Sequence, residues 1–100
     1  MSFKIIFSPK VYDDLQEAVD FYNTRNKGLG ARFIKKIKIR ISYIKSNTYG
    51  YQVRYNEIRC APVDSFPYTI HYKVIAEINT IIIVAVLCDY RDPTLWETRL

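Results

Sequence analysis

The sequence contains few of the residue types that build metal centres and thiol catalysts. It has one histidine, His71, and two cysteines, Cys60 and Cys88, which do not form a Cys-X-X-Cys pair. A zinc site needs three or four such ligands, so we expect no metal. Both cysteines lie in apolar, strand-like runs and are predicted to be small buried side chains in a reducing cytosol. A Cys88–His71 nucleophilic pair is disfavoured, because no third group that would orient it is evident.

Long hydrophobic runs and glycine-rich motifs are also missing. The longest apolar run, Ile81 to Cys88, has eight residues, whereas a membrane helix needs about 20. The N-terminal residues lead into a strand-like pattern without the apolar core of a signal peptide, so we expect a cytoplasmic protein with no membrane contact. Gly28 and Gly30 follow a helical pattern rather than a strand, which argues against phosphate-binding and dinucleotide-binding loops. No cofactor is therefore expected.

What the chain does contain is apolar residues, tyrosine and positive charge. Its 100 residues fit a single domain, 1–100, with one core. The hydrophobic fraction of 49% and the nine tyrosines argue against disorder. The net charge of +5 favours anionic partners, such as nucleic acid, a ribosome surface or an acidic protein.

The N-terminal half predicts a strand followed by two helices. Phe3 to Phe7 reads as the strand, and Ser8 and Pro9 are typical of an N-cap and a first helical position. This helix is expected to end in the polar stretch Asn23 to Lys27, before Gly28. Its early turns carry acidic residues that we interpret as complementing the helix dipole: Asp13, Asp14 and Glu17.

A second helix is predicted from about Leu29 to Ser46, with an apolar face and a basic face. The apolar residues fall within one arc: Phe33, Ile34, Ile37, Ile41 and Ile44. The basic residues fill the remaining circumference: Arg32, Lys35, Lys36, Lys38 and Arg40. Such a face either keeps the protein soluble or binds a partner or nucleic acid. Ile39 projects among these charges, either as an ordinary exposed residue or as a partner contact.

The second half of the chain is rich in β-branched and aromatic residues and predicts four strands: Tyr51–Tyr55, Ile58–Val63, Tyr68–Ile75 and Ile81–Cys88. Tight turns are expected at Asn56-Glu57 and Asn79-Thr80, and a longer one at 64–67. Strand 68–75 alternates in a way that favours one face on helices and one face toward solvent or a partner. The last strand is apolar on both faces and is placed centrally. The order predicts an α+β fold with a helical hairpin on a mostly antiparallel sheet.

Four basic residues on or beside these strands are the candidates for chemistry: Arg54, Arg59, Lys73 and Arg91. On a concave sheet they would hold phosphates or stabilise the charge of a phosphoryl transition state, with tyrosines stacking on bases. The alternative is solvated charge beside a half-buried sheet. Both interpretations stay open.

The landmarks, taken in order, resemble the RelE/ParE superfamily of toxins from bacterial type II toxin–antitoxin systems, which includes plasmid stabilisation proteins. The similarity runs over about 90 residues. Its pieces are Phe7-Ser8-Pro9, Asp14-Leu15, Phe21-Tyr22, the stretch from Gly28 to Phe33, Arg59, the stretch from Phe66 to Tyr72, and Ala85-Val86 through Arg91-Asp92-Pro93 to Trp96. Many relatives carry a histidine where this chain has Cys88.

The resemblance implies one of two activities on one fold. RelE-like members cleave mRNA on the ribosome, and on that branch Arg59 and Arg91 would stabilise charge while Tyr90 would transfer a proton. ParE-like members poison DNA gyrase and are not enzymes of this kind. The Phe-Pro-Tyr strand and the Arg-Asp-Pro ending favour the ParE branch, and the extreme tail has no tyrosine for a RelE-like role.

The resemblance also implies a protein partner. The cognate antitoxin would be a small acidic protein whose disordered tail folds over the basic surface and Ile39. A non-toxic module that only binds an antitoxin is the alternative from another functional class. An unrelated RNA-binding domain is disfavoured, because no signature of the common RNA-binding modules is present.

Overall fold

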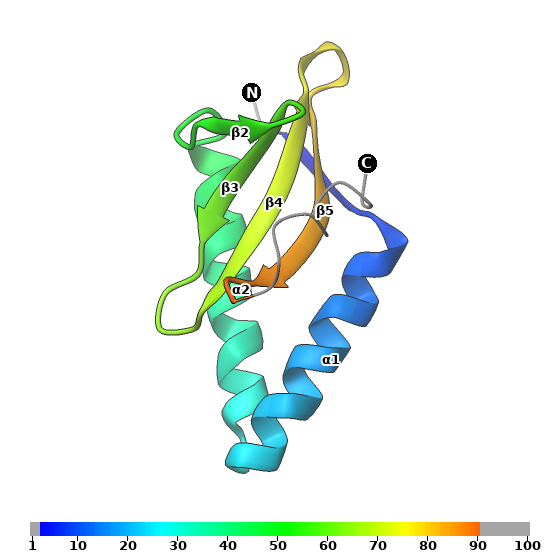
Figure 1. Cartoon of the computed structure of the whole chain (residues 1–100). Coiled ribbons are helices and arrows are strands. Elements are labelled where there is room, and N and C mark those ends of the chain that lie inside the picture. Colours follow the sequence, from blue (N-terminus) through cyan, green and yellow to red (C-terminus); the bar gives the residue numbers. More distant parts are fainter. Residues whose placement is uncertain (1–2, 91–100) are drawn as a thin grey trace.

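The computed structural model describes residues 3–90, which form a five-stranded sheet with two helices on one face (Figure 1). The elements in chain order are β1 (Lys4–Phe7), α1 (Pro9–Arg25), α2 (Leu29–Ser46), β2 (Val53–Tyr55), β3 (Ile58–Pro62), β4 (Tyr68–Ile75), the 3-10 turn η1 (Ala76–Ile78) and β5 (Thr80–Cys88). The predicted α+β class and helical hairpin are confirmed, and α2 has the predicted ends.

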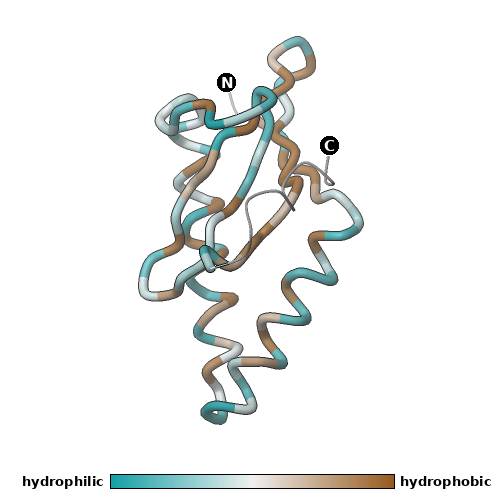
Figure 2. The backbone as a smooth tube through the Cα atoms, in the orientation of Figure 1, coloured by the Kyte–Doolittle hydropathy of each residue, from teal (hydrophilic) through white to brown (hydrophobic). Residues whose placement is uncertain are grey.

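The sheet has the order β1-β5-β4-β3-β2. The first strand runs parallel to β5, from Lys4 opposite Thr80 to Phe7 opposite Ile83, and the other three pairings are antiparallel. The mostly antiparallel sheet is therefore confirmed, and β5 lies inside it, as its apolar composition predicts. Figure 2 shows continuous hydrophobic colour along much of β5, whereas both helices alternate.

The main core lies between the helices and the sheet. Phe33, Ile37 and Ile44 of α2 are at most 2% exposed, and they share this core with Ile70 and Tyr72 of β4. These are positions of the predicted apolar arc and of one face of the predicted strand. Among residues 3–90, neither helix has the combination of length and apolarity that a membrane-spanning helix requires.

Two glycines shape the hairpin in different ways. Gly28 is the N-cap of α2 with φ of +85°, a conformation that suits glycine. Gly30 instead allows the helices to approach each other, because a Cβ there would lie 2.8 Å from both Val19 Cγ1 and Asn23 Oδ1. Its N–H donates to Asn23 Oδ1 at 2.9 Å, so the helical turn is tied to α1.

The tight turn predicted at Asn56-Glu57 is confirmed, since both residues have positive φ (40° and 65°) and join β2 to β3. The tight turn predicted at Asn79-Thr80 is wrong for Thr80, although Asn79 does lie in the turn. The chain instead forms η1, Asn79 takes φ of 48°, and Thr80 already belongs to β5. The connection between β4 and β5 is therefore made by η1 and Asn79.

A smaller apolar cluster lies on the sheet face that alternates with the helix-packed one. It comprises Ile58, Val84, Ala85 and Leu87, with Tyr55 and Ile82 beside them. An irregularity in the β4–β5 pairing between His71 and Tyr72 inserts Val84 as an extra residue, so Val84 and Ala85 both join this cluster. His71 on this face is only 1% exposed. The face predicted to meet solvent or a partner is therefore covered at His71 by the protein itself, with Tyr55 and Cys60 beside the imidazole.

Candidate functional site

Arg59 lies on β3 beside the loop that follows α2, and its guanidinium contacts groups of that loop. The guanidinium donates a hydrogen bond to the Tyr51 carbonyl. It also stacks over the Tyr49 ring, with Cζ 5.1 Å from the ring centroid. Tyr49 itself is 57% exposed. Arg59 therefore fastens the 49–51 loop to the sheet, and its guanidinium is already engaged by protein groups.

Arg40 belongs by sequence to the basic surface of α2, but the structure turns it toward the same loop. Its Nη1 donates to Tyr51 Oη at 2.8 Å, and its Nη2 pairs with Asp64 Oδ1 at 2.9 Å. The guanidinium also lies 5.4 Å from the Tyr43 ring centroid. With 17% of its side chain exposed, Arg40 ties α2 to two loops and leaves little free charge at the surface.

Tyr90 lies at the other end of the sheet, after β5, and is 86% exposed. It borders a groove shared with Tyr22 and Tyr68. Burial, followed by the charges of Cys88 and Tyr90, raises the pKa of the Tyr22 phenol, so Tyr22 stays neutral at physiological pH.

The structure does not bring Arg59 and Tyr90 into one site. Arg59 lies opposite Tyr72, which lies opposite Ile83. Cys88, just before the turn that carries Tyr90, is five residues farther along β5, which is about 17 Å of strand. Arg91, the third member of the RelE-like set, lies outside the described residues, as do Asp92, Pro93 and Trp96.

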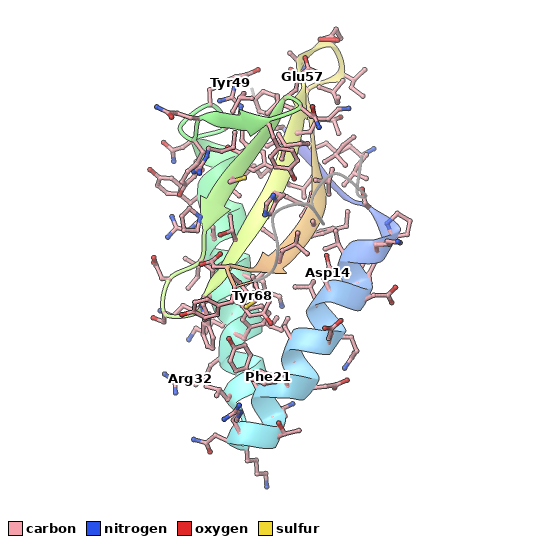
Figure 3. All side chains as sticks on the ribbon, viewed as in Figure 1. Asp14, Phe21, Arg32, Tyr49, Glu57 and Tyr68 are labelled. Atoms are coloured by element: carbon pink, nitrogen blue, oxygen red, sulfur yellow. The ribbon has the colours of Figure 1, made fainter. Side chains whose placement is uncertain are left out.

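The remaining basic residues form an exposed surface on the outer side of α2. Arg32, Lys35 and Lys38 are exposed, Lys36 is also on this helix, and Ile39 is 52% exposed among them. Figure 3 shows Arg32 projecting away from the sheet. No acidic residue occurs in α2. The sequence-predicted surface is therefore assembled on one helix, with an apolar side chain at its centre.

Arg54 and Lys73 lie apart from this helix. Arg54 is exposed on β2 and lines a small cavity of about 240 Å³ together with Cys60, Thr69 and Asp89. Lys73 is half-buried on β4. These two strand positions are therefore not part of the α2 surface.

A cluster that sequence reasoning missed surrounds His71. Its Nδ1 lies 2.9 Å from Tyr55 Oη and 3.5 Å from Cys60 Sγ. The cysteine beside the histidine is thus Cys60 and not Cys88, because the hairpin register sets Cys60 opposite His71. Burial raises the pKa of the Cys60 thiol, and nearby Arg54 lowers it by less. A protonated thiol is a poor nucleophile, and residues 3–90 contain no group of three potential metal ligands.

Asp14 is a second residue whose role was predicted incorrectly from the sequence. No acidic residue occupies the first turn of α1, so the helix-dipole interpretation is wrong for Asp13, Asp14 and Glu17 alike. Its carboxylate is nearly buried and accepts a hydrogen bond from the Val86 N–H of β5 at 3.0 Å. Beyond Ile83, β1 no longer pairs with β5, and Asp14 takes the place of the missing strand partner (Figure 3).

Comparison with known proteins relates this architecture to toxin–antitoxin systems. Residues 5–93 match the model of a family described as the ParE toxin of type II toxin–antitoxin systems, parDE. A solved structure of the chromosomal ParDE system from P. aeruginosa aligns with a TM-score of 0.75 and 13% identity, covering 86% of this chain and 95% of that one. A mutant of the E. coli toxin RelE in the free state aligns with a TM-score of 0.72 and 13% identity, covering 97% and 93%. No curated protein sequence matches the chain.

Proposed function

Because this chain belongs to the ParE toxin family of type II toxin–antitoxin systems, we propose that it arrests growth by inhibiting DNA gyrase. The solved neighbours include both a ParDE system and RelE, and at 13% identity they share the fold alone. Fold therefore does not choose between gyrase and the ribosome. The choice rests on this chain's own residues.

The observation that carries the proposal is the separation of Arg59 from Tyr90. A ribosome-dependent nuclease of this fold would need charge-stabilising and proton-transferring groups around one phosphate. Here Arg59 is engaged by the Tyr51 carbonyl and the Tyr49 ring, and Tyr90 lies at a groove with Tyr22. This arrangement favours a toxin that acts by binding its target and not by cleaving RNA.

The antitoxin partner is implied by membership of a ParDE-type family. We propose that it is acidic and covers the outer side of α2, where Lys35, Lys38 and Ile39 are exposed. A disordered acidic segment that folds there would pair with the lysines and bury the isoleucine. Titration with the product of the neighbouring reading frame tests this, and the absence of a complex at micromolar concentrations would contradict it.

The target is tested by pulse-labelling DNA and protein synthesis in a bacterial host within minutes of inducing the chain. We expect DNA synthesis to fall first and Arg59→Ala to leave toxicity in place as long as the variant stays folded. An earlier fall in protein synthesis, with growth restored by Arg59→Ala in a folded protein, would instead establish the ribosome-dependent nuclease. If neither synthesis falls, the chain is a non-toxic antitoxin-binding module.

A further inference from the structure

A cavity of about 240 Å³ opens on the sheet face opposite the helices (Figure 1). On β3, Cys60 and Pro62 flank the core residue Ala61, so their side chains lie on the face that does not pack against the helices. Five of the described residues line the cavity: Arg54, Cys60, Pro62, Thr69 and Asp89. The basic surface of α2 contributes none of them, so the cavity is a separate site.

Two opposite charges face this cavity without neutralising each other. Arg54 and Asp89 are both exposed, and neither forms an ion pair with any residue in the described part of the chain. The Arg54 guanidinium still acts on the interior, because it lowers the pKa of the Cys60 thiol, although burial raises that pKa by more. A ligand that carries both an anionic group and hydrogen-bond donors would therefore satisfy both walls.

The carboxylate of Asp89 is held at the cavity by bonds within the protein. Its backbone N–H donates to the Pro67 carbonyl at 2.8 Å, and its Oδ1 accepts a hydrogen bond from the Thr69 hydroxyl at 2.6 Å. An ionised carboxylate has about four acceptor positions, so Oδ2 and the second lone pair of Oδ1 can both accept from a ligand. The donors that use both oxygens are two adjacent N–H groups.

The remaining lining is small and largely apolar. Pro62 supplies a ring at the rim, and Cys60 supplies a half-buried thiol farther inside. The volume lies below the roughly 300 Å³ at which sites for drug-sized molecules begin. A single planar ring system fits such a space, and the rest of the ligand stays outside, where Arg54 is exposed.

These requirements together describe a guanine nucleotide. On the Watson–Crick edge, guanine presents two adjacent donors, N1–H and the N2 amino group, whereas adenine and cytosine each present one amino group beside a ring acceptor and uracil presents one N–H. The nucleotide phosphate is the anion that the exposed Arg54 requires. The net charge of +5 also favours the approach of an anion.

We propose that this cavity binds a guanine nucleotide. Asp89 accepts hydrogen bonds from N1–H and N2–H of the base, Arg54 pairs with the phosphate, and Cys60 and Pro62 lie against the ring. This site goes beyond the growth-arresting function and does not depend on it, since it uses neither the α2 surface nor the toxin's target.

The first test is isothermal titration calorimetry of the folded full chain with GMP and AMP. We expect GMP to bind at least about fivefold more tightly than AMP, because a bidentate base contact discriminates by about that factor or more. Equal affinities would mean that only the phosphate is recognised and would overturn the proposal. The absence of GMP binding would overturn it as well.

Asp89→Asn tests the base contact directly. The amide replaces one acceptor by a donor, so the variant should bind GMP at least about fivefold more weakly and prefer xanthosine monophosphate, whose base has a carbonyl in place of the guanine amino group. Asp13→Asn removes the same charge at an exposed position of α1 and should keep the preference for GMP. A folded Asp89→Asn variant that still prefers GMP would refute the assignment.

Arg54→Gln tests the phosphate contact. We expect it to weaken GMP by about two- to fivefold, the range of an exposed ion pair, and to leave guanosine unchanged. Lys45→Gln, at an exposed position in the last turn of α2, is the matched control and should change neither. An equal loss of GMP binding in the control would show that overall charge attracts the phosphate, against a role for Arg54.

The source of the nucleotide is distinguished with two RNA heptamers, UUUGUUU and UUUUUUU. Tighter binding of UUUGUUU than of GMP, with UUUUUUU at least about fivefold weaker, would support a guanine presented by an RNA strand. Tighter binding of GMP than of either RNA would support a free nucleotide. Equal affinity of the two RNAs, both above that of GMP, would reveal attraction to the RNA backbone alone and overturn guanine recognition.

Discussion

Asp14 illustrates how one side chain completes a sheet that the backbone leaves short. Its carboxylate accepts the Val86 N–H at a place where β1 has ended. Removing the acceptor leaves a buried donor without its partner, which costs more than the net value of the bond. We expect Asp14→Ala to lower the free energy of unfolding by about 1–3 kcal/mol, measured by urea denaturation. The exposed neighbour Asp13→Ala should change it by less than about 0.5 kcal/mol, and equal losses would show that the strand contact is unimportant.

Tyr72 gives the protein a pH dependence at the alkaline end. Its hydroxyl is buried and donates to the Thr48 carbonyl at 2.9 Å. Burial raises its pKa to about 12, against a smaller lowering by Arg59. Because the folded pKa lies above the unfolded value near 10, the neutral phenol stabilises the fold below about pH 10. That contribution is lost as the pH rises from about 10 to about 12.

The measurement is urea unfolding of the wild type and Tyr72→Phe at about pH 9 and about pH 11.5. Phenylalanine cannot ionise, so the variant should lose less stability between the two pH values than the wild type. The difference should be on the order of a few kcal/mol at most. Parallel pH dependences of the two proteins would show that other groups control alkaline unfolding.

At the scale of elements, the helical hairpin depends on the close approach at Gly30. A methyl group there would lie 2.8 Å from Val19 Cγ1 and 2.9 Å from the Val19 carbonyl oxygen. The backbone of α1 cannot yield as a flexible side chain would. We expect Gly30→Ala to destabilise the fold by about 1–3 kcal/mol, despite the better helix propensity of alanine. Thermal denaturation with Ser42→Ala on the exposed side of α2 as control tests this, and a stabilised Gly30→Ala would refute it.

The sequence predicts elements better than partners, for a physical reason. Phe33, Ile37 and Ile44 recur with the 3.6-residue period of a helix because all three are buried on one face, so the pattern predicts α2 with its observed ends. The partners of Arg40 and His71 depend on which loop or strand lies across from them. In the sequence Arg40 does not differ from the other basic residues of α2, because Asp64 and Tyr51 become its partners only in the folded chain. For His71, the register of the β3–β4 hairpin places Cys60 opposite it, and that register is known only once the sheet is formed.

At the scale of the whole molecule, charge is divided between the two helices. The four acidic residues of the hairpin all belong to α1, together with Lys10 and Arg25, whereas α2 carries basic residues and no acidic one. This division makes the proposed antitoxin contact testable by mutation. An acidic antitoxin segment should depend on the basic residues of α2 and not on α1.

The antitoxin contact is therefore predicted to respond to charge reversal on α2 alone. Lys35→Glu with Lys38→Glu replaces two exposed positive charges by negative ones. We expect the double variant to bind the antitoxin at least about tenfold more weakly at low salt, with the difference shrinking as salt screens the charges. Isothermal titration calorimetry at two salt concentrations measures this.

Lys10→Glu with Lys27→Glu makes the same net-charge change at exposed positions outside α2. An equal loss in that control would mean that overall charge, and not the α2 surface, attracts the antitoxin. Unchanged affinity in both variants would remove the antitoxin segment from α2 altogether.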